Sequence, residues 1–80
     1  MSTINIPESD FISYREFIEG NPVSVRTVSL GNDDDYEKGK NVVVTHLTME
    51  AIGKIVSEPI IIDHDKDKTV LSVIIEKNPV

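Results

Sequence analysis

The chain has 80 residues, a mass of 8.9 kDa and a formal net charge of −6, with 39% apolar and 28% charged residues. This balance is typical of one small folded domain, because disordered chains usually combine a lower apolar content with a larger charge imbalance. The chain has no cysteine, which excludes disulfides, thiolate nucleophiles and cysteine-based metal centres. Its acidic charge repels phosphate backbones, so we expect no direct nucleic-acid binding.

Membrane insertion and secretion are also not expected. The longest aliphatic runs are residues 42–44 and 60–62, whereas a membrane-spanning helix needs about 20 mostly apolar residues. The first residues, 1–5, lack the basic start and apolar run of a signal peptide. Together with the absence of cysteine, these observations predict a cytoplasmic protein without a membrane partner.

The first predicted element is a helix over residues 8–19. Apolar positions recur there at spacings of three and four, which is typical of an amphipathic helix. They are Phe11, Ile12, Tyr14, Phe17 and Ile18. Asp10 suits the positive end of the helix dipole. Gly20 and then Pro22 provide a left-handed cap and a residue that cannot continue the helix.

Two strands joined by a long polar loop are predicted next. Residues 23–30 are rich in β-branched side chains, with Val25 on the inward face. The alternation slips at Val28, which predicts a bulge or a strand covered on both faces. Residues 41–47 form the second strand, and the loop over residues 31–40 makes the pair a long-looped hairpin.

A second helix and a second hairpin are predicted in the rest of the chain. Thr48 can cap a helix that ends before Pro59, since apolar residues between them recur at helical spacing. Gly53 weakens this helix by about 1 kcal/mol relative to alanine. Residues 60–62 and 69–76 then form two strands joined across a charged tip.

This order of elements predicts the α+β class. The chain has no room for long crossovers, so we expect a single domain over residues 1–80, with a mainly antiparallel sheet of about four strands and one or two helices packed on one face. Residues 1–6 and 77–80 are expected to be frayed. Open sheet edges are compatible with a monomer or a homodimer. The predicted core residues are Phe11, Ile18, Val25, Val43, Ile52, Ile55, Ile61, Val73 and Ile75.

The sequence carries no recognisable pattern of an enzyme, a cofactor site or a metal site. The glycines do not fit a phosphate-binding loop, and no Gly-x-Ser-x-Gly occurs. Residues 63–67 imitate the start of a calcium loop, but Lys68 stands where that loop needs glycine, which favours a solvated hairpin tip. We expect His46 to be a strand-end residue with one satisfied ring nitrogen and His64 to lie on the surface.

The most distinctive segment is the acidic loop over residues 31–40. Its candidate partner-binding residues are Asp33, Asp34, Asp35, Tyr36 and Glu37. An aromatic ring among carboxylates can anchor on an arginine-rich surface by stacking and salt bridging, so we expect a protein partner with a basic surface. The carboxylates of the first helix extend this candidate surface; they are Asp10, Glu16 and Glu19. The alternative is a solvated loop partly neutralised by Lys38 and Lys40.

These features predict a small, acidic, non-enzymatic binding protein that inhibits or modulates a larger basic protein of nucleic-acid handling or defence. Small phage-encoded inhibitors mimic nucleic acid in this way, by presenting carboxylates where phosphates are expected. The alternative is a structural or assembly subunit that pairs through a sheet edge. A long uncovered apolar strand would favour that alternative. A third interpretation is a minor enzyme or metal protein built around His46 and His64.

Overall fold

The computed structural model describes residues 2–29 and 36–78, and its first strand, β1 (Ser2–Asn5), lies parallel to β3 (Asn41–His46). The side chains of Ile4 and Ile6 are fully buried, and the Ile6 N–H donates to the Thr45 carbonyl at 2.8 Å. Residues 2–6 thus belong to the sheet and its core, whereas the sequence suggests a frayed segment. These isoleucines anchor the segment because each removes a large apolar side chain from water.

The helix region follows the prediction closely. A 3₁₀ turn, η1 (Glu8–Asp10), leads into α1 (Phe11–Ile18). The Asp10 carboxylate caps α1 by accepting from the Ser13 N–H at 3.3 Å. At the other end Gly20 has a φ of 94° and its N–H donates to the Phe17 carbonyl. The Asn21 N–H donates to the Glu16 carbonyl, which completes a Schellman cap.

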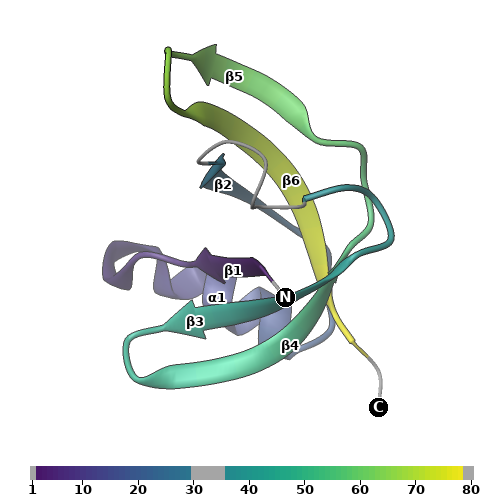
Figure 1. Ribbon diagram of the computed structural model, residues 1–80. Helices are drawn as coiled ribbons and strands as arrows, with labels where there is room; N and C mark the ends of the chain where they lie inside the picture. The colour runs from purple at the N-terminus through teal and green to yellow at the C-terminus, as the bar shows by residue number, and fades with distance from the viewer. Residues whose placement is uncertain (1, 30–35, 79–80) are drawn as a thin grey trace.

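The sheet has six strands instead of the expected four. The remaining strands are β2 (Val23–Ser29), β4 (Met49–Ile55), β5 (Ile60–His64) and β6 (Thr69–Lys77). Their order is β1-β3-β4-β6-β2, with β5 also paired to β6 (Figure 1). Only the β1–β3 pair is parallel among the described strands, so the sheet is mixed. The sheet curves strongly and is barrel-like, with β1 and β2 approaching each other.

The first predicted hairpin is wrong in its pairing. β2 does not pair with residues 41–47 but with β6, in a continuous antiparallel register that places Val25 opposite Val73. No bulge interrupts β2. Its alternation continues because Thr27 faces inward and is 9% exposed, while Val28 faces outward. An inward threonine was the signal that a purely apolar count overlooked.

The predicted second helix is also wrong, because this segment is strand β4. It forms a tight hairpin with β3 in which Leu47 adopts a φ of 56°. The buried positions alternate, with Gly53 and Ile55 facing inward and Ile52 outward. The sequence analysis paired residues 41–47 with residues 23–30, whereas in the structure β3 pairs with β4 and satisfies the backbone of this segment.

The core lies between the inner face of the sheet and α1. Its residues are Ile4, Ile6, Tyr14, Phe17, Val23, Val25, Tyr36, Val42, Val44, Ile55, Leu71, Val73 and Ile75. Four predicted core residues are confirmed, namely Val25, Ile55, Val73 and Ile75. Four are exposed instead, namely Phe11, Ile18, Ile52 and Ile61. Val43 is only half-buried.

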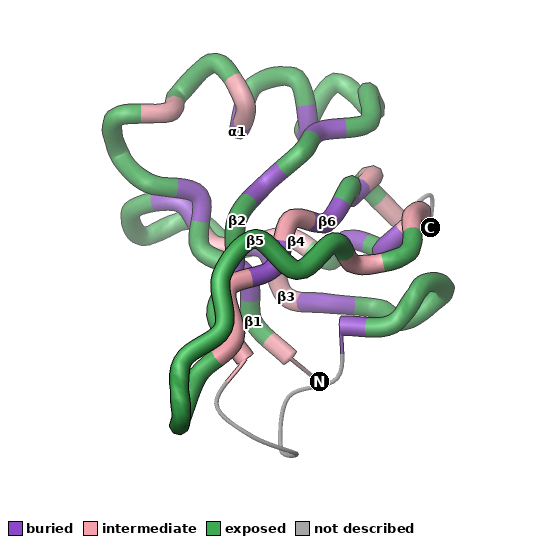
Figure 2. The backbone as a smooth tube through the Cα atoms, turned by 90° about the horizontal axis from the view of Figure 1, so that it is seen from above, coloured by how far each residue is buried: buried purple, intermediate pink, exposed green. Residues whose placement is uncertain are grey.

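These errors have two physical causes. The buried stripe of α1 is centred on Tyr14 and Phe17, so Phe11 and Ile18 lie at its margins. The hairpin of β5 and β6 extends away from the helix (Figure 2). Ile61 therefore has no layer to pack against, although its neighbour Leu71 on β6 is buried. Residues near the C-terminus also belong to the sheet. Lys77 is the last residue of β6, and the Asn78 N–H donates to the Ile52 carbonyl.

We predict that Gly53→Ala destabilises the domain by about 1–3 kcal/mol, because a Cβ at this position overpacks the core. That Cβ would lie 2.9 Å from Phe17 Cε1 and 3.0 Å from Val44 Cγ2. Both neighbours are fully buried, so neither side chain can move away without disturbing the packing around it. Chemical denaturation measures the change. Glu50→Ala on the same strand is the control, with an expected change within about 0.5 kcal/mol; equal stability of the two variants would contradict the packing of α1 over β4.

Candidate functional site

The structure assigns Tyr36 a different place from the one its sequence context predicts. Asp33, Asp34 and Asp35 lie outside the described residues. Tyr36 is only 6% exposed, and its hydroxyl donates to the Thr3 carbonyl at 3.3 Å. Little of this ring is therefore accessible to a partner, in contrast to the surface anchor that the sequence suggests. The ring has a structural role because the small core has few other aromatic side chains to fill it.

Tyr36 also protects an edge of the sheet. The Ile6 N–H points at β3, where it bonds Thr45. Backbone groups alternate in direction along a strand, so those of Thr3 point away from β3, toward the free side of β1. The Tyr36 hydroxyl satisfies one of these groups. β1 is therefore partly covered by a side chain, which is one way in which proteins protect sheet edges.

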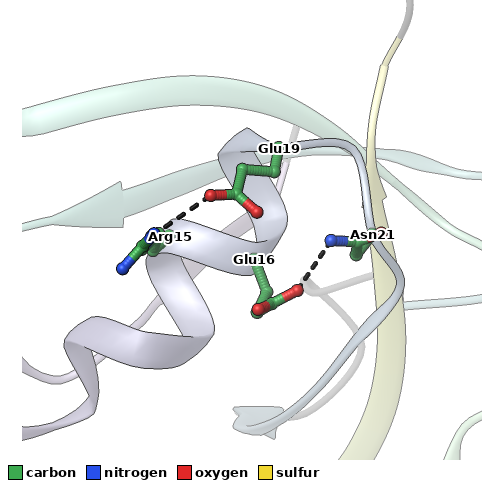
Figure 3. A network of polar contacts seen from close by, with 4 residues as sticks. All are labelled: Arg15, Glu16, Glu19 and Asn21. Carbon is green, nitrogen blue, oxygen red and sulfur yellow. Dashed lines mark hydrogen bonds and ion pairs between the residues drawn. The ribbon is translucent and has the colours of Figure 1, made fainter.

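The acidic residues of the helix take part in local contacts (Figure 3). Glu19 forms an ion pair with Arg15 at 3.1 Å, and Glu16 accepts a hydrogen bond from Asn21 at 2.6 Å. Asp10 is used as the N-cap. The contacts of Glu16 and Glu19 are exposed, so they contribute little to stability. Arg15 neutralises part of the negative charge of this surface through its ion pair with Glu19.

The two histidines occupy different environments. His46 is 1% exposed and its Nδ1 lies 3.0 Å from the Ile6 carbonyl, as the strand-end prediction requires. Its ring stacks on Tyr14 with centroids 4.6 Å apart. His64 lies on the surface, as predicted, with Nδ1 2.9 Å from the Thr69 hydroxyl. The two belong to different hairpins, and within residues 2–29 and 36–78 no three potential metal ligands cluster.

Strand β5 carries a run of exposed apolar side chains. Ile60, Ile61 and Ile62 are consecutive and are 66%, 65% and 45% exposed. All five residues of the strand are exposed, and the strand forms the outer border of the β5–β6 hairpin (Figure 2). Large apolar side chains that gather at the surface commonly mark a site of interaction. β5 is therefore the candidate functional site. The sequence analysis predicted this segment only as a strand, with Ile61 in the core.

Hydrogen bonds at the hairpin tip determine which backbone groups face the free side of β5. The Asp65 N–H donates to the Lys68 carbonyl at 2.8 Å, so Asp65 points its backbone at β6. By alternation Asp63 also points at β6 and His64 points away. The His64 N–H already bonds Oδ1 of Asp63 at 2.8 Å. The His64 donor is therefore occupied.

The backbone of Ile61 faces the free side. The Val56 N–H donates to the Ile74 carbonyl at 2.9 Å, so Ile74 points at this side of β6. Ser72, two residues earlier, points the same way and is the partner of Ile60. The backbone groups of Ile60 therefore point at β6. The next residue, Ile61, directs its N–H and C=O toward the free side of β5.

Two features shorten the pairing edge of β5. Pro59 precedes the strand and has no N–H to donate. The register shifts between Ile61 and Asp63, which leaves Ile62 as an extra residue in a β-bulge. Prolines and bulges both limit the pairing of exposed edges. Ile61 is thus the position of β5 best placed to pair with another strand.

Comparisons of the chain with models of protein families, with curated proteins and with solved structures found no match. In the described part of the chain, no helix is long and apolar enough to cross a membrane.

Substitution of Tyr36 tests its assignment to the core. We predict that Tyr36→Ala lowers the free energy of unfolding by about 3–5 kcal/mol, because a buried aromatic ring is lost. Tyr36→Phe keeps the ring and should cost only about 0.5–1.5 kcal/mol for the lost hydrogen bond to Thr3. Thermal and chemical denaturation measure both. Wild-type stability of Tyr36→Ala would contradict the burial of this ring.

Proposed function

We propose that this protein is a small non-enzymatic binding module that assembles with another polypeptide through β5. The observation that carries the proposal is the exposure of three consecutive isoleucines on one strand, Ile60, Ile61 and Ile62. Of the three functions considered from the sequence, this observation favours the assembly subunit. It gives the module a contact made mainly by side chains and centred on Ile61.

The free energy available at β5 supports this proposal. Fully burying one isoleucine side chain contributes about 1.5–3 kcal/mol. Three adjacent isoleucines can therefore supply a substantial part of the binding free energy before the cost of association is subtracted. The short pairing edge adds few backbone hydrogen bonds, so apolar packing provides most of the affinity.

A second candidate is the acidic inhibitor or modulator that docks on a basic, nucleic-acid-handling or defence protein. The net charge of −6 favours it, because charge complementarity accelerates association with a basic surface. Its candidate residues are Asp33, Asp34, Asp35 and Glu37 with Asp10, Glu16 and Glu19 of the helix region. The local use of three of these carboxylates and the burial of Tyr36 weaken this candidate.

Matched variants distinguish the two candidates in capture experiments with extract of the source organism. We predict that Ile60→Lys/Ile61→Lys abolishes partner capture, because each lysine places a charge in the apolar contact. Ile12→Lys is the control for the same chemical change, since Ile12 on α1 is 74% exposed. The triple variant Asp33→Lys/Asp34→Lys/Asp35→Lys should retain capture. Loss of capture in the triple variant alone would support the acidic inhibitor, and capture by the β5 variant would contradict the proposal.

A further inference from the structure

We propose, on the basis of the proposed function of β5, that its occupant is a second copy of this chain. In this homodimer the two β5 strands lie antiparallel and are related by a two-fold axis that passes between their Ile61 residues. A two-fold contact uses the same surface on both copies. The structure supports this register through the backbone, the side chains and the charges of β5.

The backbone of β5 suits pairing of Ile61 with itself. Ile61 directs both its N–H and its C=O toward the free side, as the ladder between β5 and β6 requires. In an antiparallel pair, two directly opposite residues of this kind exchange two hydrogen bonds. A two-fold axis at Ile61 therefore satisfies both outward groups in each copy.

The side chains of β5 are self-complementary in the same register. Ile60 then lies opposite Ile62 of the second copy, and Ile61 lies opposite Ile61. The three exposed isoleucines of each copy are thus placed against apolar partners. Cross-strand pairs between β-branched residues stabilise a sheet, whereas an isoleucine opposite a charged residue would remain poorly buried.

The charges at the ends of β5 select this register over its neighbours. Glu58 lies opposite His64 of the second copy, where the imidazole can donate to the carboxylate. The Nδ1 of His64 contacts the Thr69 hydroxyl; when it accepts there, Nε2–H is the donor. A shift by one residue in either direction would place Glu58 opposite Asp63 or Asp65, and opposed like charges destabilise a strand pair.

The geometry also explains why the assembly closes at two copies. Pro59 lies opposite Asp63 beyond the isoleucines, and neither residue can extend the ladder there, because Pro59 lacks an N–H and Asp63 points at β6. The contact occupies the free edge of β5 in both copies. An isologous contact of this kind leaves no second β5 edge for growth into a fibre.

Cysteine cross-linking tests the register directly, because the chain has no cysteine of its own. We predict that Ile61→Cys forms a disulfide-linked dimer on mild oxidation, since opposite Cα atoms lie about 5.5 Å apart in such a pair. Ile60→Cys and Ile62→Cys should cross-link with each other more than with themselves. Ile12→Cys, on an equally accessible helix position, is the control and should stay largely monomeric.

Sedimentation velocity over a range of concentrations tests the dimer without a covalent bond. Ile61→Lys should weaken dimerisation by more than about tenfold, whereas Ile12→Lys should not change it. His64→Glu should weaken the dimer because it places two carboxylates opposite each other across the axis. Glu58→Lys should weaken it because it removes the carboxylate that accepts the hydrogen bond from His64. The double variant should restore it.

The outcomes separate this inference from the proposed function. A wild-type chain that stays monomeric at all concentrations would overturn the homodimer, as would failure of Ile61→Cys to cross-link faster than Ile12→Cys. In either case, if Ile60→Lys/Ile61→Lys still loses capture of a different protein from the extract, the proposed function of β5 is supported. A dimer that tolerates Ile61→Lys would overturn the homodimer through β5, and a β5 variant that also retains heterologous capture would overturn the proposed function.

Discussion

The arrangement of this domain depends on the pairing of β6, which is a partner of three other strands. One side of β6 is paired with β2 along seven consecutive residues. The other side is shared, because β4 pairs near Ile75 and β5 pairs near Leu71. Since β6 has nine residues and α1 packs over only part of the sheet, the outer half of β6 carries β5 beyond the helix layer. The exposure of the isoleucines follows from this geometry.

Local sequence patterns predicted the helix and the β5–β6 hairpin, but neither strand β4 nor the long-range pairing of β2 with β6. The helix and its Gly20 cap were predictable because a residue pattern and a stop signal agree there. The hairpin of β5 and β6 was also predictable, since its strands are adjacent in the chain. The β2–β6 pair was not predictable, because no local pattern specifies a distant partner. At β4, apolar residues fitted a helical period, and the competing signal was Gly53, which suits a close approach of Phe17.

The candidate site differed from the prediction because composition describes a side chain without its neighbours. Tyr36 follows acidic residues in the sequence, yet its ring is buried in the core. The whole chain has only four aromatic residues, so the core needs this ring to fill its volume. Conversely, three successive isoleucines suggest a buried strand. Strand geometry was the signal that could have corrected this view. Consecutive residues of a strand point to opposite faces of the sheet, so all three isoleucines can be buried only if both faces are covered.

The register of β2 on β6 has a consequence for folding kinetics. Val23 lies opposite Ile75 and Ser29 opposite Thr69, separations of 52 and 40 positions along the chain. Domains dominated by such distant contacts fold slowly, on the scale of about milliseconds to seconds. The β5–β6 hairpin needs only local contacts and forms on the scale of about microseconds. It therefore displays its isoleucines before the core has closed, and in this interval Pro59 and the bulge at Ile62 keep nascent chains from pairing indiscriminately.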